Sequence, residues 1–202
     1  SAPQGGGAYI IQGTSLSVDG QGSSVVFMKN VATTFGGGLF MDTAEGSITD
    51  GALLHVEGNS IPESSSSPFQ KGVGLFLQSS MLKISGAQTL MILDKNIGSS
   101  KSAGGGMACA QTASMIVESG ARVLIANNFA HIGGGGSFYD CDVHVIGANS
   151  ELLLTGNVAA SSQGGGGAVL GGKNLLLITD GGKLSILNNT ALGGSGGGIV
   201  MR

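Results

Sequence analysis

A run of glycines followed by a short apolar stretch recurs along the chain and constrains its fold more than any other feature. Two typical copies read Gly36-Gly37-Gly38-Leu39-Phe40-Met41 and Gly104-Gly105-Gly106-Met107-Ala108-Cys109. Self-similarity at a period of roughly 20–50 residues indicates a solenoid, a propeller or another repeat array. The last glycines of the seven copies stand about 31 residues apart, at Gly7, Gly38, Gly74, Gly106, Gly136, Gly167 and Gly198.

Each repeat divides into three short apolar strands separated by turn residues. In the first repeat the strands are expected at residues 8–11, 15–18 and 24–28, with Asp19-Gly20 and Asn30 at the turns. Three strands in about 31 residues match one coil of a parallel β-helix, whereas a propeller blade needs four strands and roughly 40–50 residues. We therefore predict an all-β, single-stranded, right-handed parallel β-helix of about six coils, the handedness following from the usual crossover of parallel strands.

The repeat runs from one end of the chain to the other, so residues 1–202 are expected to form a single β-helix segment. One irregularity is the Ser- and Pro-rich stretch 60–71, which lengthens one repeat and is predicted to leave the coil as a surface loop insertion. Solenoids normally carry polar caps over their open ends. Because no cap is visible, the chain is expected to be a fragment of a longer repeat array.

An asparagine follows the third strand of each repeat in the pattern apolar-x-x-Asn. Side-chain amides at the same corner of successive coils can hydrogen-bond to one another as a ladder. Asparagine also tolerates the left-handed backbone that a sharp corner requires. The predicted structural ladder consists of Asn30, Asn59, Asn96, Asn128, Asn157 and Asn189.

The second position after the glycine motif is often aromatic. Strand alternation places it on the face opposite the first and third positions, and polar residues such as Asp42 and Gln78 share its parity. This favours an outward-facing interaction stripe, although the opposite parity, with the aromatic rings in the core, stays open. The stripe would consist of Tyr9, Phe40, Phe76 and Phe138.

Composition excludes several kinds of partner. The formal net charge is −3 and the nine Lys and Arg residues are scattered, so no basic patch for a nucleic acid is expected. No apolar run is long enough to span a bilayer.

Cys109 and Cys141 lie one repeat apart but two columns out of register, which favours two small buried thiols and leaves a disulfide open.

No catalytic, cofactor or metal site is evident. His55, His131 and His144 share no column, and the acidic residues are dispersed. The best acidic pair is Asp19 and Asp50, which are expected to share one corner column with the more distant Asp180; Asp42 and Asp140 are expected to share another column but lie three coils apart. The Asp-Gly corners are first of all turns. One glycosylation sequon is present, with Asn188 as its acceptor.

The pairing of a glycine-glycine-aliphatic motif with an apolar-x-x-Asn motif resembles the repeats of the chlamydial polymorphic membrane proteins. Phe27-Met28-Lys29-Asn30 has the Phe-x-x-Asn form of that family, while none of the seven glycine motifs reads Gly-Gly-Ala-Ile, so the match is to the wider class of such β-helix repeats. In the named family the repeats form the secreted passenger of an autotransporter and act as adhesins.

These observations lead us to expect a non-enzymatic protein of the cell surface or extracellular space. It would act as an adhesin passenger or as a rod-like component of a surface filament. Its partners would be other protein chains, neighbouring repeats of the same protein, or a host-cell receptor or glycan. The alternative is a polysaccharide-cleaving β-helix enzyme that uses acids on the coil surface, of which Asp19 and Asp50 are the best candidates.

Overall fold

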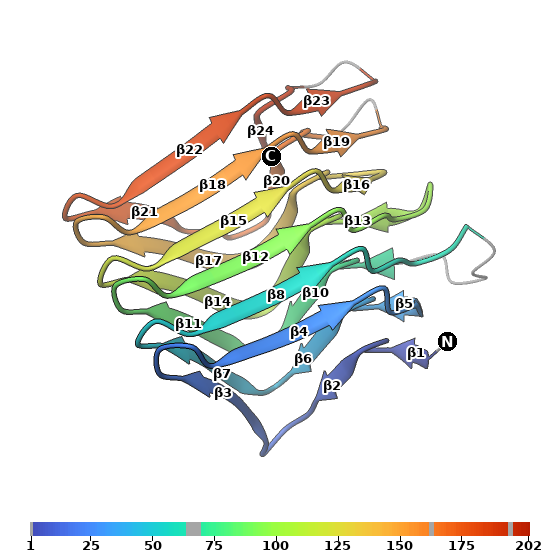
Figure 1. Ribbon diagram of the computed structural model, residues 1–202. Helices are drawn as coiled ribbons and strands as arrows, with labels where there is room; N and C mark the ends of the chain where they lie inside the picture. Colours follow the sequence, from blue (N-terminus) through green and yellow to red (C-terminus); the bar gives the residue numbers. More distant parts are fainter. Residues whose placement is uncertain (1, 64–69, 162–163, 194–195) are drawn as a thin grey trace.

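The computed structural model describes residues 2–63, 70–161, 164–193 and 196–202, and in it the chain is a parallel β-solenoid. About six turns, roughly 32 residues apart, stack on one another, and the described residues contain no helix (Figure 1). The predicted all-β coil stack is therefore confirmed. Each strand pairs in parallel with an equivalent strand of a neighbouring coil, so that residues one coil apart form columns.

The largest sheet receives a first and a second strand from each coil. The second strand follows the first around a corner, and in the fourth and fifth coils the two merge into β14 and β17. The first strands are β2 (Ala8–Ile10), β6 (Leu39–Asp42), β10 (Leu75–Gln78), β20 (Ala168–Gly171) and β24 (Ile199–Met201). The second strands and the merged strands are β3 (Ser15–Asp19), β7 (Glu45–Thr49), β11 (Met81–Ser85), β21 (Leu176–Thr179), β14 (Met107–Glu118) and β17 (Gly136–Ile146).

The third strands form a regular six-stranded sheet on the other side of the core. They are β4 (Ser24–Met28), β8 (Leu53–Glu57), β12 (Leu90–Asp94), β15 (Arg122–Ala126), β18 (Glu151–Thr155) and β22 (Lys183–Leu187). The structure adds short fourth strands, between the asparagine corner and the next glycine motif. These are β1 (Ala2–Gln4), β5 (Ala32–Phe35), β9 (Gln70–Lys71), β13 (Ser102–Ala103), β16 (Phe129–Ala130), β19 (Val158–Ala159) and β23 (Thr190–Ala191).

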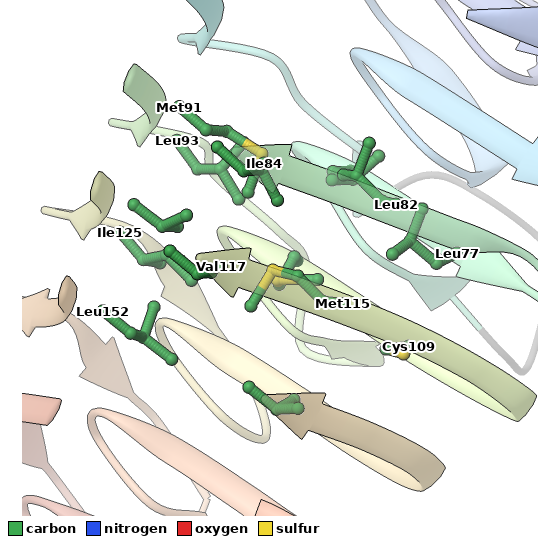
Figure 2. Close-up of a cluster of buried hydrophobic side chains, with 14 of the residues drawn as sticks. Leu77, Leu82, Ile84, Met91, Leu93, Cys109, Met115, Val117, Ile125 and Leu152 are labelled. Atoms are coloured by element: carbon green, nitrogen blue, oxygen red, sulfur yellow. The ribbon is translucent and has the colours of Figure 1, made fainter. Parts of the chain in front are cut away.

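The core lies between the large sheet and the six-stranded sheet. Alternate residues of each strand point inward, as in β11, where Leu82 and Ile84 are fully buried while Lys83 is not. Figure 2 shows Ile84 beside Met91 and Leu93 of β12 inside the coil, with Leu82 farther along its strand toward Leu77. Columns of aliphatic side chains thus run along the axis of the rod.

The asparagines form a continuous ladder at the corner after the third strand. Asn96 is typical, because both its backbone N–H and its Nδ2 donate to Oδ1 of Asn128, at 2.9 Å each. Its Nδ2 also donates to the carbonyl oxygen of Val56 in the preceding coil at 3.1 Å. The same bonds join Asn30, Asn59, Asn96, Asn128, Asn157 and Asn189 in sequence.

Six of the seven glycine motifs place a glycine against this ladder, which explains why the two motifs occur together; these are Gly7, Gly38, Gly74, Gly106, Gly135 and Gly167. A Cβ on Gly106 would fall 2.9 Å from Nδ2 of Asn128 and 2.5 Å from Cγ2 of Ile125. A Cβ on Gly74 would likewise fall 2.8 Å from Nδ2 of Asn96. Only a residue without a side chain lets the first strand pass this close to the amides.

We expect Gly106→Ala to lower the free energy of unfolding by about 3 kcal/mol, because the methyl group forces both the ladder and Ile125 to shift. Urea unfolding followed by circular dichroism measures the effect. Gly198→Ala is a matched control, since Gly198 ends the last glycine motif, its φ also lies outside the left-handed region, and an added Cβ would meet only Cγ2 of Ile186 at 3.4 Å. An equal loss in both variants would contradict the steric explanation.

The corners between the second and third strands alternate between two types along the rod. The shorter corner begins with two left-handed residues, as at Asp50 and Gly51, with φ of 54° and 86°. The longer corner separates its left-handed residues by one position, as at Gly86 and Gln88, with φ of 99° and 66°. Stacked corners therefore differ in length. The N–H of the second left-handed residue in a short corner, such as Gly51, needs a hydrogen-bond acceptor other than a backbone carbonyl of the next coil.

A buried hydroxyl in the longer corner supplies that partner. Thr89 Oγ1 accepts the N–H of Gly51 at 2.9 Å and donates to the carbonyl oxygen of Ser85 at 2.8 Å. Ser150 does the same two coils later for Gly120 and Ile146, at 3.0 and 2.7 Å.

Replacing Thr89 by valine keeps the shape of the side chain and removes its hydroxyl. We expect a loss of about 2 kcal/mol in unfolding free energy, since the N–H of Gly51 is left without an acceptor. Thr49→Val is the control, because the hydroxyl of Thr49 is exposed and bonds Asp19 on the surface. Chemical denaturation of both variants checks the prediction, and equal stabilities would contradict it.

Fewer residues of the stretch 60–71 leave the coil than predicted. Ser60 forms β-bridges with Val31 and Ile97, and the Ile61 side chain is buried. At the other end Gln70 and Lys71 form β9 and pair with β13. The ends of the stretch therefore belong to the coil, while residues 64–69 lie outside the described residues.

Candidate functional site

The predicted aromatic interaction stripe is wrong, because most of its rings are covered. Phe40 and Phe76 are only 1% exposed, although they do face away from the main core. Phe35 of the short strand β5 lies over them, with ring centroids 5.7 and 5.2 Å away. A second, smaller core thus forms between the first and fourth strands, and the sequence prediction omitted the fourth strand that closes it.

Of the expected stripe, Tyr9 is exposed as predicted, whereas Phe138 is buried. Tyr9 is 43% exposed and stacks on Phe40 at 4.8 Å. Its phenol donates to Asp42, and desolvation together with that carboxylate raises the pKa of Tyr9. Phe138 points into the main core, because Gly136 is the residue that pairs with Met107 and shifts the following register by one.

The predicted pairing of Asp19 with Asp50 and that of Asp42 with Asp140 are also wrong. Asp19 lies opposite Thr49, whose hydroxyl donates to it at 2.7 Å, and Asp50 is one residue farther along. Asp50 and Asp180 each begin a short corner with a φ of 54°, which is a backbone role. Along the column of Asp42 the equivalent residue in the fifth coil is Tyr139 instead of Asp140.

The three histidines lie at separate places. His55 is 3.6 Å from Glu57 on the same strand, and His144 lies opposite Ile116 and Leu177. His131 follows the short strand β16. Within the described ranges no group of three His, Cys, Asp or Glu side chains could hold a metal ion.

Several surface carboxylates are held in ion pairs. Lys83 lies 2.7 Å from Glu118 and, as the largest cause, lowers the pKa of that carboxyl group. Lys183 does the same for Glu151, assisted by Ser185 and Arg122. Lowered pKa values keep these groups ionised at neutral pH, which makes them unsuited to donate a proton as a general acid.

Cys109 and Cys141 form a disulfide bond, so the expectation of two buried thiols is corrected. Their Cα atoms are 5.7 Å apart and both side chains are buried. Cys141 lies opposite Ala113, while Cys109 lies opposite Phe138, and the left-handed Asp140 turns the chain between Tyr139 and Cys141. This local turn brings together two cysteines that stand in different columns.

A notch lies on the outer surface at the corner between the first and second strands. The fifth coil turns here in a single left-handed residue, Asp140, whereas the fourth coil uses Gln111 and Thr112. The sixth coil leaves β20 at Gly171 and rejoins the sheet only at Leu176. The recessed fifth corner leaves a hollow of about 620 Å³, lined by Gln111, Thr112, Asp140, Asp142, Gly172 and Lys173.

Hydrogen bonds fasten the sixth corner to the floor of the notch. The N–H groups of Lys173 and Leu175 donate to Oδ1 of Asp140 and Oδ1 of Asp142, at 2.8 and 2.9 Å. The N–H of Cys141 donates to Oδ1 of Asn174 at 2.9 Å. The disulfide fixes the residue between the two aspartates, so the notch is held in shape from both sides.

Sequence reasoning missed this notch because it depends on corner lengths in three neighbouring coils. The run Gly133 to Gly136 hid the true register, since its last glycine is the first residue of the following strand.

In comparisons with known proteins, no family, no curated protein and no solved structure matches the chain. Asn188, the predicted glycosylation acceptor, is exposed beside the ladder residue Asn189. No helix of the described residues is long and apolar enough to cross a membrane.

Proposed function

We propose that the chain is a non-enzymatic rod of the cell surface or extracellular space that presents its outer surface for adhesion. The observation that carries this proposal is the Cys109–Cys141 disulfide, which joins two adjacent coils and is buried. Structural disulfides persist in oxidising compartments and are rare in the cytosol. The resemblance to repeats of surface passenger proteins agrees with this location.

The internal bonding of the rod supports a mechanical role. The asparagine ladder runs through all six coils, and six of the seven glycine motifs pack against it. Such a stack positions surface groups rigidly along an axis, as adhesins and appendage subunits require. The adhesin role and the filament role differ in whether the chain associates with itself.

The polysaccharide-cleaving alternative loses its main argument. It depended on Asp19 and Asp50 lying in one column, and the register separates them by one residue. Asp19 bonds Thr49, and Asp50 forms a corner. We therefore do not propose catalysis at these acids.

Two measurements test the proposal together. Antibodies against the folded chain should label intact cells that produce it, and beads coated with the oxidised chain should adhere to host cells or matrix. Sedimentation at rising concentration then separates an elongated monomer, which favours the adhesin role, from ordered filaments. Labelling only after cell permeabilisation, with free thiols at Cys109 and Cys141, would contradict the surface location.

A further inference from the structure

We propose that the notch formed by the fourth, fifth and sixth coils is a binding site for a neutral saccharide, with the exposed ring of Tyr139 as its stacking platform. This inference rests on the surface role proposed above and names the class of ligand. Ligand sites are concave, largely preformed and equipped with a few polar groups that set the orientation of the ligand. The notch has these properties.

The polar groups of the notch suit sugar hydroxyls. Asp140 and Asp142 each use Oδ1 for a backbone N–H, and in the described part of the chain Oδ2 of each carboxylate has no hydrogen-bond partner. These oxygens can accept hydrogen bonds from hydroxyl groups, and such charge-assisted bonds are strong. Gln111 and Thr112 on the opposite wall are exposed; the Gln111 amide can donate and accept, while the Thr112 hydroxyl, which donates to the carbonyl oxygen of Gln111, can accept.

Tyr139 supplies an apolar surface at the edge of the notch. Its side chain is 57% exposed, and the ring lies over Gly171 and next to Gly172. A Cβ on Gly171 would fall 3.0 Å from Cδ2 of this ring, so glycine at that position lets the ring lie flat on the neighbouring coil. A flat, exposed tyrosine beside hydrogen-bonding groups combines an apolar face with a polar tip.

Charge indicates that the sugar is neutral. Asp140 and Asp142 outweigh Lys173, the only basic residue of the lining, so the notch has a formal charge of −1. Lys173 forms no ion pair within the described ranges, and its fixed contact with Asp140 is made by its backbone N–H. Uronic or sialic acids would meet two carboxylates and be repelled.

The notch is also prepared in advance of binding. Three hydrogen bonds hold the sixth corner, and the Cys109–Cys141 disulfide holds the residue between the two aspartates. A rigid site binds with less loss of conformational entropy than a mobile loop would. An aspartate pair that served only as a corner brace would not need an open hollow and an exposed ring beside it.

The test is titration of the oxidised chain with cellohexaose, maltohexaose and N-acetylchitohexaose, followed by NMR, with hexagalacturonate as the anionic probe. We expect at least one neutral probe to bind, with shifts confined to the notch, and hexagalacturonate not to bind. Tyr139→Ala should weaken binding about tenfold, and Asp142→Asn should weaken it as well. Tyr9→Ala is the matched control, because it removes an exposed tyrosine of the first coil and should leave the affinity unchanged.

Circular dichroism of each variant shows whether it has folded. Lys173→Ala is a second variant for testing the notch, because the backbone contact of Lys173 with Asp140 survives the change. No binding of the three neutral probes, stronger binding of hexagalacturonate, or equal loss in Tyr139→Ala and Tyr9→Ala would overturn the inference. Adhesion of coated beads distinguishes this failure from that of the proposed function. If beads coated with Tyr139→Ala chains still adhere, the adhesin role stands and the notch is not the binding site.

Discussion

Asn128→Ala is expected to lower the free energy of unfolding by about 4 kcal/mol, the largest effect of any single substitution considered for this chain. Oδ1 of Asn128 accepts two donors of Asn96, at 2.9 Å each. Its Nδ2 donates to Leu93 O at 2.9 Å and to Asn157 Oδ1 at 3.0 Å. Alanine leaves these buried groups without their partners, and each such group costs about 1–3 kcal/mol.

Urea unfolding and native-state hydrogen exchange measure this effect. Exchange should accelerate most in the coils around the substitution, because solenoid repeats depend mainly on their neighbours. Asn127→Gly is the control, since Asn127 is the adjacent exposed residue and has a left-handed φ of 55° that glycine adopts freely. A loss at position 128 no greater than at position 127 would show that the ladder contributes little to stability.

Removal of the disulfide should have the second largest effect. We expect Cys109→Ala/Cys141→Ala to unfold with about 3–4 kcal/mol less free energy than the oxidised chain, as the chain-entropy description gives for a link across 32 residues. The cross-link limits the unfolded chain, and its loss enlarges that ensemble. Urea titration of the oxidised chain, the reduced chain and the double variant measures the difference.

The reduced chain separates the cross-link from side-chain packing. If the link is responsible, reduced wild type and the double alanine variant should have similar stabilities, both well below the oxidised chain. Alkylation under denaturing conditions without reductant should modify neither cysteine. Two alkylated cysteines in the untreated chain would contradict the disulfide and remove the main support for an oxidising location.

The periodic features of the fold could be read from the sequence. The spacing of the glycine motifs and the turn residues predicted a parallel coil stack, and the structure confirms it. The asparagine positions predicted the corner at which the ladder of hydrogen bonds runs. These features repeat in every coil and depend on contacts between equivalent residues, so the columns can be aligned without knowing the rest of the structure.

Other features depend on the register and on what covers each face, and these could not be read from the repeat. Gly136 belongs to the strand, which moves Phe138 into the core and Asp140 out of the column of Asp42.

The short strand β5 covers Phe40 and Phe76, and a single left-handed residue brings Cys141 to Cys109. The sequence by itself determined the solenoid, because one period specifies both its strands and its ladder. The tertiary structure alone decided the disulfide, the second core and the notch, because each arises where neighbouring coils differ from the repeat.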